Sequence, residues 1–517
     1  MTVNKLMVRL PMVVAVALIG SCRQDTATNT DVGTEQFGAP GSGYIAQCSG
    51  WFPDWISTVP PAAGQTDFQL SQAYYLGVPV LATVGGQTTV TAYKRPPDAP
   101  LSDAPWLAYD FHSSGQPSEY ASALLAYVLN GNAEAGFEIP PVPFAQWFNV
   151  PMMTTDSFTR REPLHGLTRE RTLSHTDWSW INNGSTLRSY AIGYYNALGS
   201  YTVGQVFKDI DPSKADPTKA SFVNGTLVFK ILFSEYAPAK INTASYPLTH
   251  APAWTIQDVG APAAANDISV RLIQMDIAVK DARSPTGWVF ATYDYDESNA
   301  DPNPWKRLTA VGLMWGDDPT VNTPGQTLTE TWLNPALPAA MKTHIGVDGR
   351  LIGPVDNPAS SCISCHSTAQ VDQGVAQSAT GATSIFTGNT TIIPTSCTVA
   401  QRANWFRDLP SGTPFGMMDG TPAGSGCNVV AAPSGTTLRS MDNSLQLQVG
   451  LISSLYRGNP NPCTGKTPGQ TEAPQAPGQP LGPVGPRRVM AGEKQRVVVS
   501  KELARALQSS EDGGSRR

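Results

Sequence analysis

The stretches Leu227-Val-Phe-Lys-Ile-Leu-Phe233 and Ile273-Gln-Met-Asp-Ile-Ala-Val279 determine the fold class of this chain. In both, an apolar side chain recurs at every second position, which places these side chains on one face of an extended strand. They are Leu227, Phe229, Ile231 and Phe233 in the first stretch and Ile273, Met275, Ile277 and Val279 in the second. The segment Trp288–Tyr295 is rich in aromatic and β-branched residues, which are common in strands. The centre of the chain is therefore predicted to be a β-sheet.

The same type of structure is predicted over residues 44–349. Ser189–Tyr195 and Tyr201–Phe207, joined by a turn through Asn196 and Gly199, are predicted to form a hairpin. One helix is predicted from about Ser118 to Asn130, between a proline at its entry and a glycine just past its end. Short strands separated by turns in a chain with 46 Gly and 44 Pro favour a sandwich-like or irregular β fold.

The sequence pattern changes after Gly353. A first helix is predicted from the N-cap Asn357 to about Val371, a second over about Val399 to Asp408, and a third from near Thr437 to Gly458. The predicted fold class is therefore α+β: a β-rich, sandwich-like unit at residues 44–349, followed by a small, mostly α-helical domain at residues 350–463.

Composition and charge exclude two classes of protein. The 517 residues are 41% hydrophobic, and no run beyond the N-terminus approaches the roughly 20 apolar residues needed to cross a bilayer, which excludes a protein with several membrane spans. The net charge is −6, but residues 1–21 carry +2 and residues 487–517 carry +4, which leaves −12 for residues 22–486. A body that acidic repels phosphate backbones, so nucleic-acid binding is excluded.

The N-terminus has the pattern of an export signal: basic Lys5 and Arg9, then an apolar run to Ile19. The run ends in Leu18-Ile-Gly-Ser-Cys22, which resembles the lipobox of bacterial lipoproteins. The resemblance implies that residues 1–21 are a signal peptide and that Cys22 carries a lipid anchor. It also implies that the protein is held on the periplasmic side of a bacterial membrane or exported. Because Gln24–Phe37 is polar and turn-rich, residues 22–43 are predicted to form a flexible tether. An ordinary signal peptide, cleaved nearby, is the alternative.

The strongest chemical signal is Cys362-Ile-Ser-Cys365-His366. C-x-x-C-H is the attachment signature of c-type haem: the two thiols bond the porphyrin and the imidazole ligates the iron. A redox dithiol is disfavoured because Gly353-Pro354 precedes the motif in place of a buried strand. A zinc site is disfavoured because no second C-x-x-C or H-x-x-H is present.

Residues 350–463 therefore resemble a c-type cytochrome domain. The resemblance implies one covalent haem c on Cys362 and Cys365, with His366 as the proximal ligand. In small cytochromes c, a methionine before the last helix commonly fills the sixth position, which here indicates Met418 or Met417. The alternatives are Met441, His165 or a vacant position.

Export also indicates an oxidising compartment in which the remaining cysteines tend to pair. Three pairings of the four are open; local spacing favours Cys397–Cys427, which leaves Cys48–Cys463. Residues 464–517 carry prolines at every third position from Pro474 to Pro486 and a basic end, and are predicted to be a disordered tail, with partner docking as the alternative.

Two weaker features have competing interpretations. The segment from Glu162 to Arg171, which includes His165, could line a substrate or propionate pocket, but a solvated charge cluster on a turn is favoured. Asp294-x-Asp296-x-Ser298, followed by Asp301, begins like a calcium loop; it lacks the required glycine and terminal acid, so Asx turns are predicted.

Taken together, these patterns predict a haem c-binding, membrane-anchored electron-transfer protein of the cell envelope, which exchanges electrons with a redox partner protein or a small molecule. The alternative is a haem-dependent oxidoreductase, peroxidase-like or acting on another small molecule, with an open iron site. A third interpretation makes the β-rich part a carbohydrate- or partner-binding module. No catalytic residues are assigned.

Overall fold

The computed structural model describes residues 44–46, 73–84, 87–139, 147–149, 162, 164–207, 215–257, 267–338, 341–372, 397–418, 427–430 and 434–452. Contacts divide the chain into two units, Met1–Gln36 and Phe37–Arg517, and every described residue belongs to the second. The predictions for the signal peptide, Cys22, the Cys48–Cys463 pair and the tail after residue 463 fall outside the described residues.

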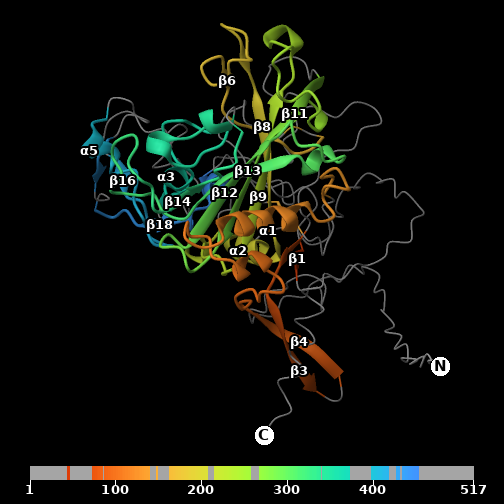
Figure 1. Cartoon of the computed structure of the whole chain (residues 1–517). Helices are drawn as coiled ribbons and strands as arrows, with labels where there is room; N and C mark the ends of the chain where they lie inside the picture. The colour runs from red at the N-terminus through yellow and green to blue at the C-terminus, as the bar shows by residue number, and fades with distance from the viewer. Residues whose placement is uncertain are drawn as a thin grey trace, which may run out of the picture. The chain divides into compact units, whose positions relative to one another are not determined.

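An eight-stranded antiparallel sheet forms the centre of the second unit (Figure 1). Its strand order is β14-β13-β12-β11-β9-β8-β5, and β10 pairs with one end of β11. The strands are β5 (Thr168–Arg169), β8 (Ser189–Tyr195), β9 (Leu227–Glu235), β10 (Ala253–Gln257), β11 (Asp267–Lys280), β12 (Trp288–Tyr295), β13 (Leu308–Met314) and β14 (Thr331–Leu333).

Smaller elements surround this sheet. The two-stranded pairs are β1 (Tyr44–Ala46) with β2 (Ala73–Tyr75), β3 (Val78–Val84) with β4 (Gln87–Lys94), β6 (Leu173–Ser174) with β7 (Thr186–Leu187), β15 (Gln370–Asp372) with β18 (Leu438–Ser440), and β16 (Met417–Met418) with β17 (Val429–Val430). The α-helices in the described residues are α1 (Pro117–Leu129), α2 (Ala197–Val206), α3 (Cys362–His366), α5 (Val399–Arg402) and α6 (Leu445–Ile452).

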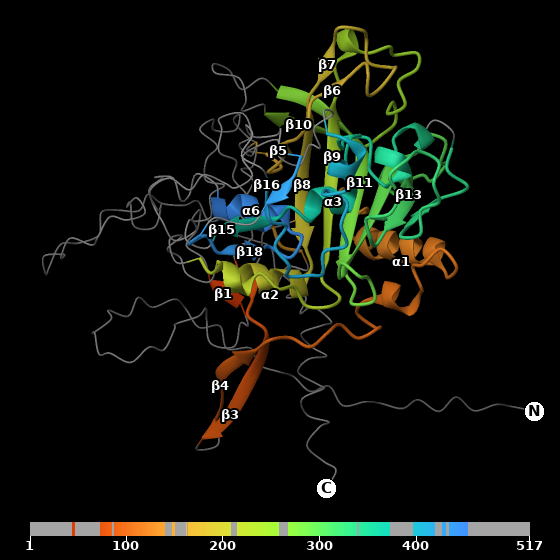
Figure 2. The same cartoon turned by 90° about the vertical axis from the view of Figure 1, so that its left-hand side faces the viewer.

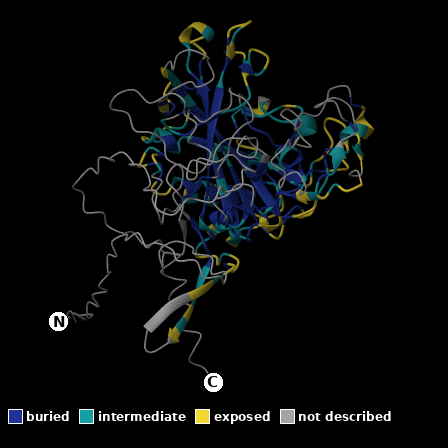
Figure 3. Ribbon diagram, turned by 180° about the vertical axis from the view of Figure 1, so that it is seen from behind, coloured by how far each residue is buried: buried dark blue, intermediate teal, exposed yellow. Residues whose placement is uncertain are grey.

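The two faces of the sheet are covered by different parts of the chain. Strands β8, β9 and β11 lie between α1 on one side and α6 on the other (Figure 2). On the α1 face, Phe229, Ile231 and Ile277 are fully buried in one cluster with the inward side chains of α1. Tyr293 Oη on this face donates a hydrogen bond to the carbonyl oxygen of Ala121 in α1, at 2.7 Å. The strands at the centre of the sheet form the most deeply buried part of the molecule (Figure 3).

The opposite face, which we call the motif face, is formed by the alternate side chains of the same strands. Strand register places Lys230, Asp276 and Thr292 in one row across β9, β11 and β12. The neighbouring row contains Val228, Ala278 and Phe290. Residues from the segment 351–451 pack here: Leu351, Ile363, Val371, Met441, Leu447 and Leu451 share one apolar cluster with Ala278, Trp288 and Phe290.

The predicted fold class is wrong in both parts. The β-rich unit is not a sandwich, because its strands form one large sheet whose two faces are covered by helices and irregular segments. The segment after residue 350 is not a small, mostly helical domain: many of its apolar side chains pack against the sheet, and Trp405, Phe406 and Phe415 form a small cluster of their own.

Three predicted helices in this segment are mostly replaced by shorter elements. The first is reduced to α3 and is followed by strand β15, and the second is reduced to α5. The third is interrupted because Asp442 and Asn443 have φ of 49° and 62°, a left-handed backbone that ends the preceding strand β18 and precedes α6.

Among the elements before residue 350, the predictions for α1, β9, β11 and β12 are confirmed. The predicted hairpin is wrong, because residues 197–206 form helix α2 in place of a second strand. Asn196 is the N-cap of this helix, where its Oδ1 accepts a hydrogen bond from Gly199 N at 3.0 Å, and Gly199 lies against the Tyr195 ring with no room for a Cβ.

Candidate functional site

Helix α3, which carries the C-x-x-C-H motif, is anchored at its first turn. Ser361 is the N-cap and exchanges two hydrogen bonds with Ser364 in a capping box, at 2.8 and 2.9 Å. Ser361 Oγ also donates to Asp317 Oδ1 at 2.7 Å, and Cys362 N donates to the carbonyl of Leu351 at 3.0 Å. These bonds tie the start of the motif to the chain that follows strand β13.

The helix turns its three reactive side chains toward the same side. Cys362, Cys365 and His366 are half-buried, whereas Ile363 and Ser364 between them are buried. Positions three and four apart lie on one face of a helix, so this exposure pattern follows from the spacing of the motif. The structure thus brings together the three residues predicted to hold haem.

Cys362 and Cys365 are not joined to each other by a disulfide bond. Within the described ranges no group of three or more His, Cys, Asp or Glu side chains is arranged to hold a metal ion.

The His366 imidazole is held in the tautomer that an iron ligand requires. Its Nδ1 lies 2.9 Å from the carbonyl oxygen of Asn443. A carbonyl can only accept, so Nδ1 carries the proton and Nε2 keeps its lone pair when the ring is neutral. Burial lowers the pKa of His366 to about 4, so the ring is neutral at physiological pH. Such a bond to a carbonyl is the usual outer-shell support of a metal-ligating histidine.

Two residues of β12 form the floor beneath α3. The Phe290 ring centroid lies 4.8 Å from that of His366. Thr292 Oγ1 lies 4.0 Å from Cys362 Sγ and donates to Asp276 Oδ1 at 3.0 Å. The motif therefore rests directly on the central strands of the sheet.

A polar cluster on the motif face adjoins Cys362. Gln274 Nε2 donates to Asp276 and to Asp356 at 2.8 and 3.0 Å, and Lys230 Nζ lies 2.8 Å from Glu170 Oε1. Burial and the neighbouring Asp356 raise the pKa of Asp276 to about 8. Burial, and then the charges of Asp356 and Asp276, raise the pKa of the Cys362 thiol, so it is protonated at neutral pH.

Sequence reasoning did not identify this cluster. The available signal was the position of Lys230 between Phe229 and Ile231 and of Asp276 between Met275 and Ile277. A third carboxyl group, that of Asp294, is buried with no hydrogen-bond partner on either oxygen. Burial raises the pKa of Asp294 well above its ordinary value, which favours the neutral form of this carboxyl group.

The candidate distal ligands occupy different places. Met417 is half-buried in β16, and the preceding Gly416 exchanges two hydrogen bonds with the side chain of Gln370, four residues after His366. Assignment of Met417 or Met418 to the iron stays a prediction. Met441 is fully buried in the cluster that contains Ile363, so packing accounts for it.

His165 does not lie with the motif. Its ring stacks on Trp254 at 4.4 Å, and Trp254 belongs to the core cluster of the α1 face. Glu162 accepts hydrogen bonds from the backbone N–H groups of Leu164, His165 and Leu167, which makes it a turn-stabilising residue. The prediction of Asx turns at Asp296 and Asp301 is confirmed by their bonds to the backbone N–H groups two residues on.

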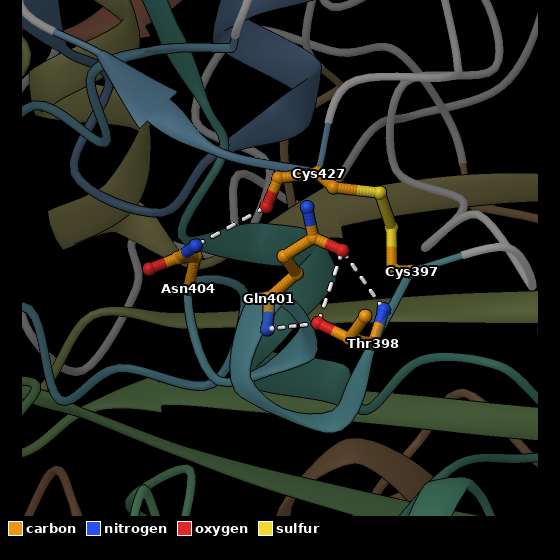
Figure 4. The surroundings of a disulfide bond; sticks show 5 residues. All are labelled: Cys397, Thr398, Gln401, Asn404 and Cys427. Atoms are coloured by element: carbon orange, nitrogen blue, oxygen red, sulfur yellow. Dashed lines mark hydrogen bonds between the residues drawn. A yellow bond between two sulfur atoms is a disulfide. The ribbon is translucent and has the colours of Figure 1, made fainter.

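The predicted Cys397–Cys427 disulfide is confirmed (Figure 4). Thr398 and Gln401 form a capping box at the start of α5, and Asn404 Nδ2 donates to the Cys427 carbonyl at 3.2 Å. The bond joins the segment before α5 to strand β17, the partner of the strand that carries Met417. It therefore brackets the loop predicted to supply the distal ligand.

Comparisons with known proteins identified no relative of this chain. No family model, no curated protein and no solved structure matches this chain. In the part of the chain that the structure describes, no helix has the length and hydrophobicity to cross a bilayer.

Proposed function

We propose that this chain is a haem c-binding electron-transfer lipoprotein of the bacterial cell envelope. The observation that carries the proposal is the arrangement of the motif. Cys362, Cys365 and His366 lie half-buried on one face of α3, and the Asn443 carbonyl holds the imidazole with Nε2 as the nitrogen left to ligate iron.

The donor set fits covalent haem. Each thiol would add across one porphyrin vinyl group, its sulfur bonding one carbon and its proton going to the other, so no oxidant or reductant is consumed. When bound, the haem supplies a one-electron iron couple. His366 would ligate the metal, the Phe290 ring packs beside the imidazole, and the bond to Asn443 raises the basicity of the imidazole.

Localisation in the envelope is part of the same proposal. The lipobox-like sequence that ends at Cys22 supplies export and a lipid anchor, and covalent haem is attached to exported proteins in bacteria. The Cys397–Cys427 disulfide supports an oxidising compartment, since such bonds are rare in the reducing cytosol. Replacing Cys22 with Ala should release the protein from membranes; a wild type that is already unlipidated and in the soluble fraction contradicts the anchor.

The test of haem attachment is a pyridine haemochrome assay together with a denaturing gel stained for haem. The full chain is made in a host that matures cytochromes c. Wild type should retain one haem per chain after denaturation, and the double variant C362A/C365A should retain none. The matched control C397S/C427S also removes two cysteines and should keep its haem. Wild-type protein without covalent haem would falsify the proposal.

A second function, that of a haem-dependent oxidoreductase, is favoured by the polar cluster beside Cys362. Half-buried Asp276 and Asp356 next to the motif could deliver protons to a substrate reduced nearby. The sixth ligand decides between the two functions. A thioether charge-transfer band at the red end of the ferric spectrum, lost in M417A/M418A, supports the electron carrier. A high-spin wild-type spectrum without that band supports the enzyme.

A further inference from the structure

The turn between β18 and α6 has a backbone that needs external support. Asp442 and Asn443 both adopt positive φ, at 49° and 62°. This left-handed conformation is uncommon for residues with a side chain and costs free energy when two occur in succession. Contacts with the rest of the molecule must therefore hold the turn in place.

Asp442 provides those contacts. It is fully buried, and its Oδ1 accepts hydrogen bonds from Lys280 Nζ at 2.6 Å, Ser411 Oγ at 2.7 Å and Trp288 Nε1 at 3.0 Å. Its Oδ2 accepts from the backbone N–H of Phe222 at 2.8 Å. The donors come from β11, β12 and two separate loops, so one carboxylate fastens the turn to the sheet.

The next residue along this turn is the one that bonds the imidazole. The Asn443 carbonyl accepts from His366 Nδ1, so the position of that carbonyl depends on the turn that Asp442 fastens. A shorter, straighter bond pushes more electron density onto the ring, and a looser bond pushes less.

We propose that Asp442, through its bonds to Lys280 and Trp288, is a positioning residue for His366 and sets its donor strength toward iron. The inference rests on the proposed haem function and extends it to residues outside the C-x-x-C-H motif. It follows that Lys280 and Trp288 in the sheet, through Asp442, contribute to the reduction potential of the haem iron. A weaker imidazole donor stabilises ferric iron less, so loosening the turn should raise the potential.

The variants must separate this role from folding. Asp442→Asn keeps the shape of the side chain, but it removes the negative charge that faces the Lys280 ammonium and replaces one acceptor oxygen with an NH2 donor, so at least one of the bonds to Asp442 is lost. Trp288→Phe removes one donor to Asp442 and retains an aromatic ring for packing beside Phe222. The control is Tyr293→Phe, which also removes one buried hydrogen bond but lies on the α1 face. If Asp442→Asn folds poorly, Trp288→Phe still tests the positioning role.

The experiment measures covalent haem content, thermal midpoint and reduction midpoint potential of the full haem-loaded protein. Asp442→Asn and Trp288→Phe should keep one haem per chain and show a higher potential than wild type. Tyr293→Phe should lose stability without a change in potential. Haem-loaded Asp442→Asn and Trp288→Phe with the wild-type potential would overturn the positioning role and leave the proposed function standing. Wild type without haem would overturn both.

Discussion

The two faces of the central sheet are built from alternate residues of the same strands, yet they have different contents. On β9, Phe229 is fully buried on the α1 face, whereas the neighbouring Lys230 is half-buried on the motif face. On β11, Ile277 and Asp276 differ in the same way. Burying a charged or polar group costs free energy, whereas burying an apolar residue at the same position does not. Stability alone therefore does not explain the polar side chains of the motif face.

This difference indicates where function is located. The α1 face is a packed core of aromatic and aliphatic side chains, covered by α1 and by segments that include Trp106, Trp147 and Trp305. The motif face carries half-exposed polar groups next to half-exposed Cys362 and His366, and it is covered by short elements from a distant part of the chain. The first face maintains the sheet, and the second presents the candidate haem-attachment site.

The largest expected effect is on the α1 face. Phe229→Ala removes a fully buried ring and should lower the free energy of unfolding by about 3–5 kcal/mol, because transfer energy is lost and a cavity remains. Denaturant unfolding monitored by tryptophan fluorescence measures the loss. Molecules that remain folded should keep the wild-type haem spectrum. A haem spectrum of folded Phe229→Ala that differs from that of wild type would show that a change on the α1 face also alters the haem site on the motif face.

The stability of the segments that cover the motif face should depend on the Cys397–Cys427 disulfide. The Cys397–Cys427 bond closes a loop of 30 residues, so C397S/C427S should lose about 3–4 kcal/mol in the chain-entropy model. Unfolding in the presence and absence of reductant checks this, since reductant should weaken wild type more than the double variant, in which only the predicted Cys48–Cys463 pair is left to reduce. Equal stability of the two proteins without reductant would show that the covering segment needs no such constraint.

The motif face should also be sensitive to pH. Because the pKa of Asp276 is raised to about 8, the native state keeps a proton that the unfolded chain loses near pH 4. The group therefore makes wild-type stability fall as pH rises from about 4 to 8. Asp276→Asn should remove this dependence, so its advantage over wild type should grow by up to about 1.4 kcal/mol per pH unit and level off above pH 8.

Urea unfolding at several pH values between 6.5 and 9 tests this prediction, in a range above the pKa of His366. Wild type and variant curves that stay parallel would mean that Asp276 is ionised in the native protein. Phe229→Ala serves as the control, because an apolar substitution on the other face should shift stability by the same amount at every pH.

The smallest expected effects come from a matched pair of tyrosines. Tyr293 Oη bonds α1 on one face, and on the other Tyr195 Oη lies 2.8 Å from Ser444 Oγ, just before α6. Each Tyr→Phe change should cost about 1 kcal/mol, the usual net value of a buried hydrogen bond. Equal losses would show that both covering layers are ordered to a similar degree; a loss at Tyr293 alone would show that the layer on the motif face is loose.

Strong local periodicity made parts of the fold predictable. The alternation of apolar residues identified β9 and β11, and a proline and a glycine marked the ends of α1. The hairpin prediction was wrong because Asn196 and Gly199 suit both a turn and a helix start, and only packing against Tyr195 distinguishes the two. The helices after residue 350 were overestimated because apolar spacing there reflects docking onto the sheet.

The C-x-x-C-H motif and the placement of its three side chains on one helical face can be read from the sequence alone, since both depend only on neighbouring residues. The strands of the sheet and the local cysteine pair were also indicated by the sequence. The bond from the His366 imidazole to the carbonyl of Asn443, 77 residues later, and the position of Asp276 beside Cys362 could be known only from the folded structure. These contacts depend on strand register and on the docking of distant segments, and short-range sequence patterns carry no record of either.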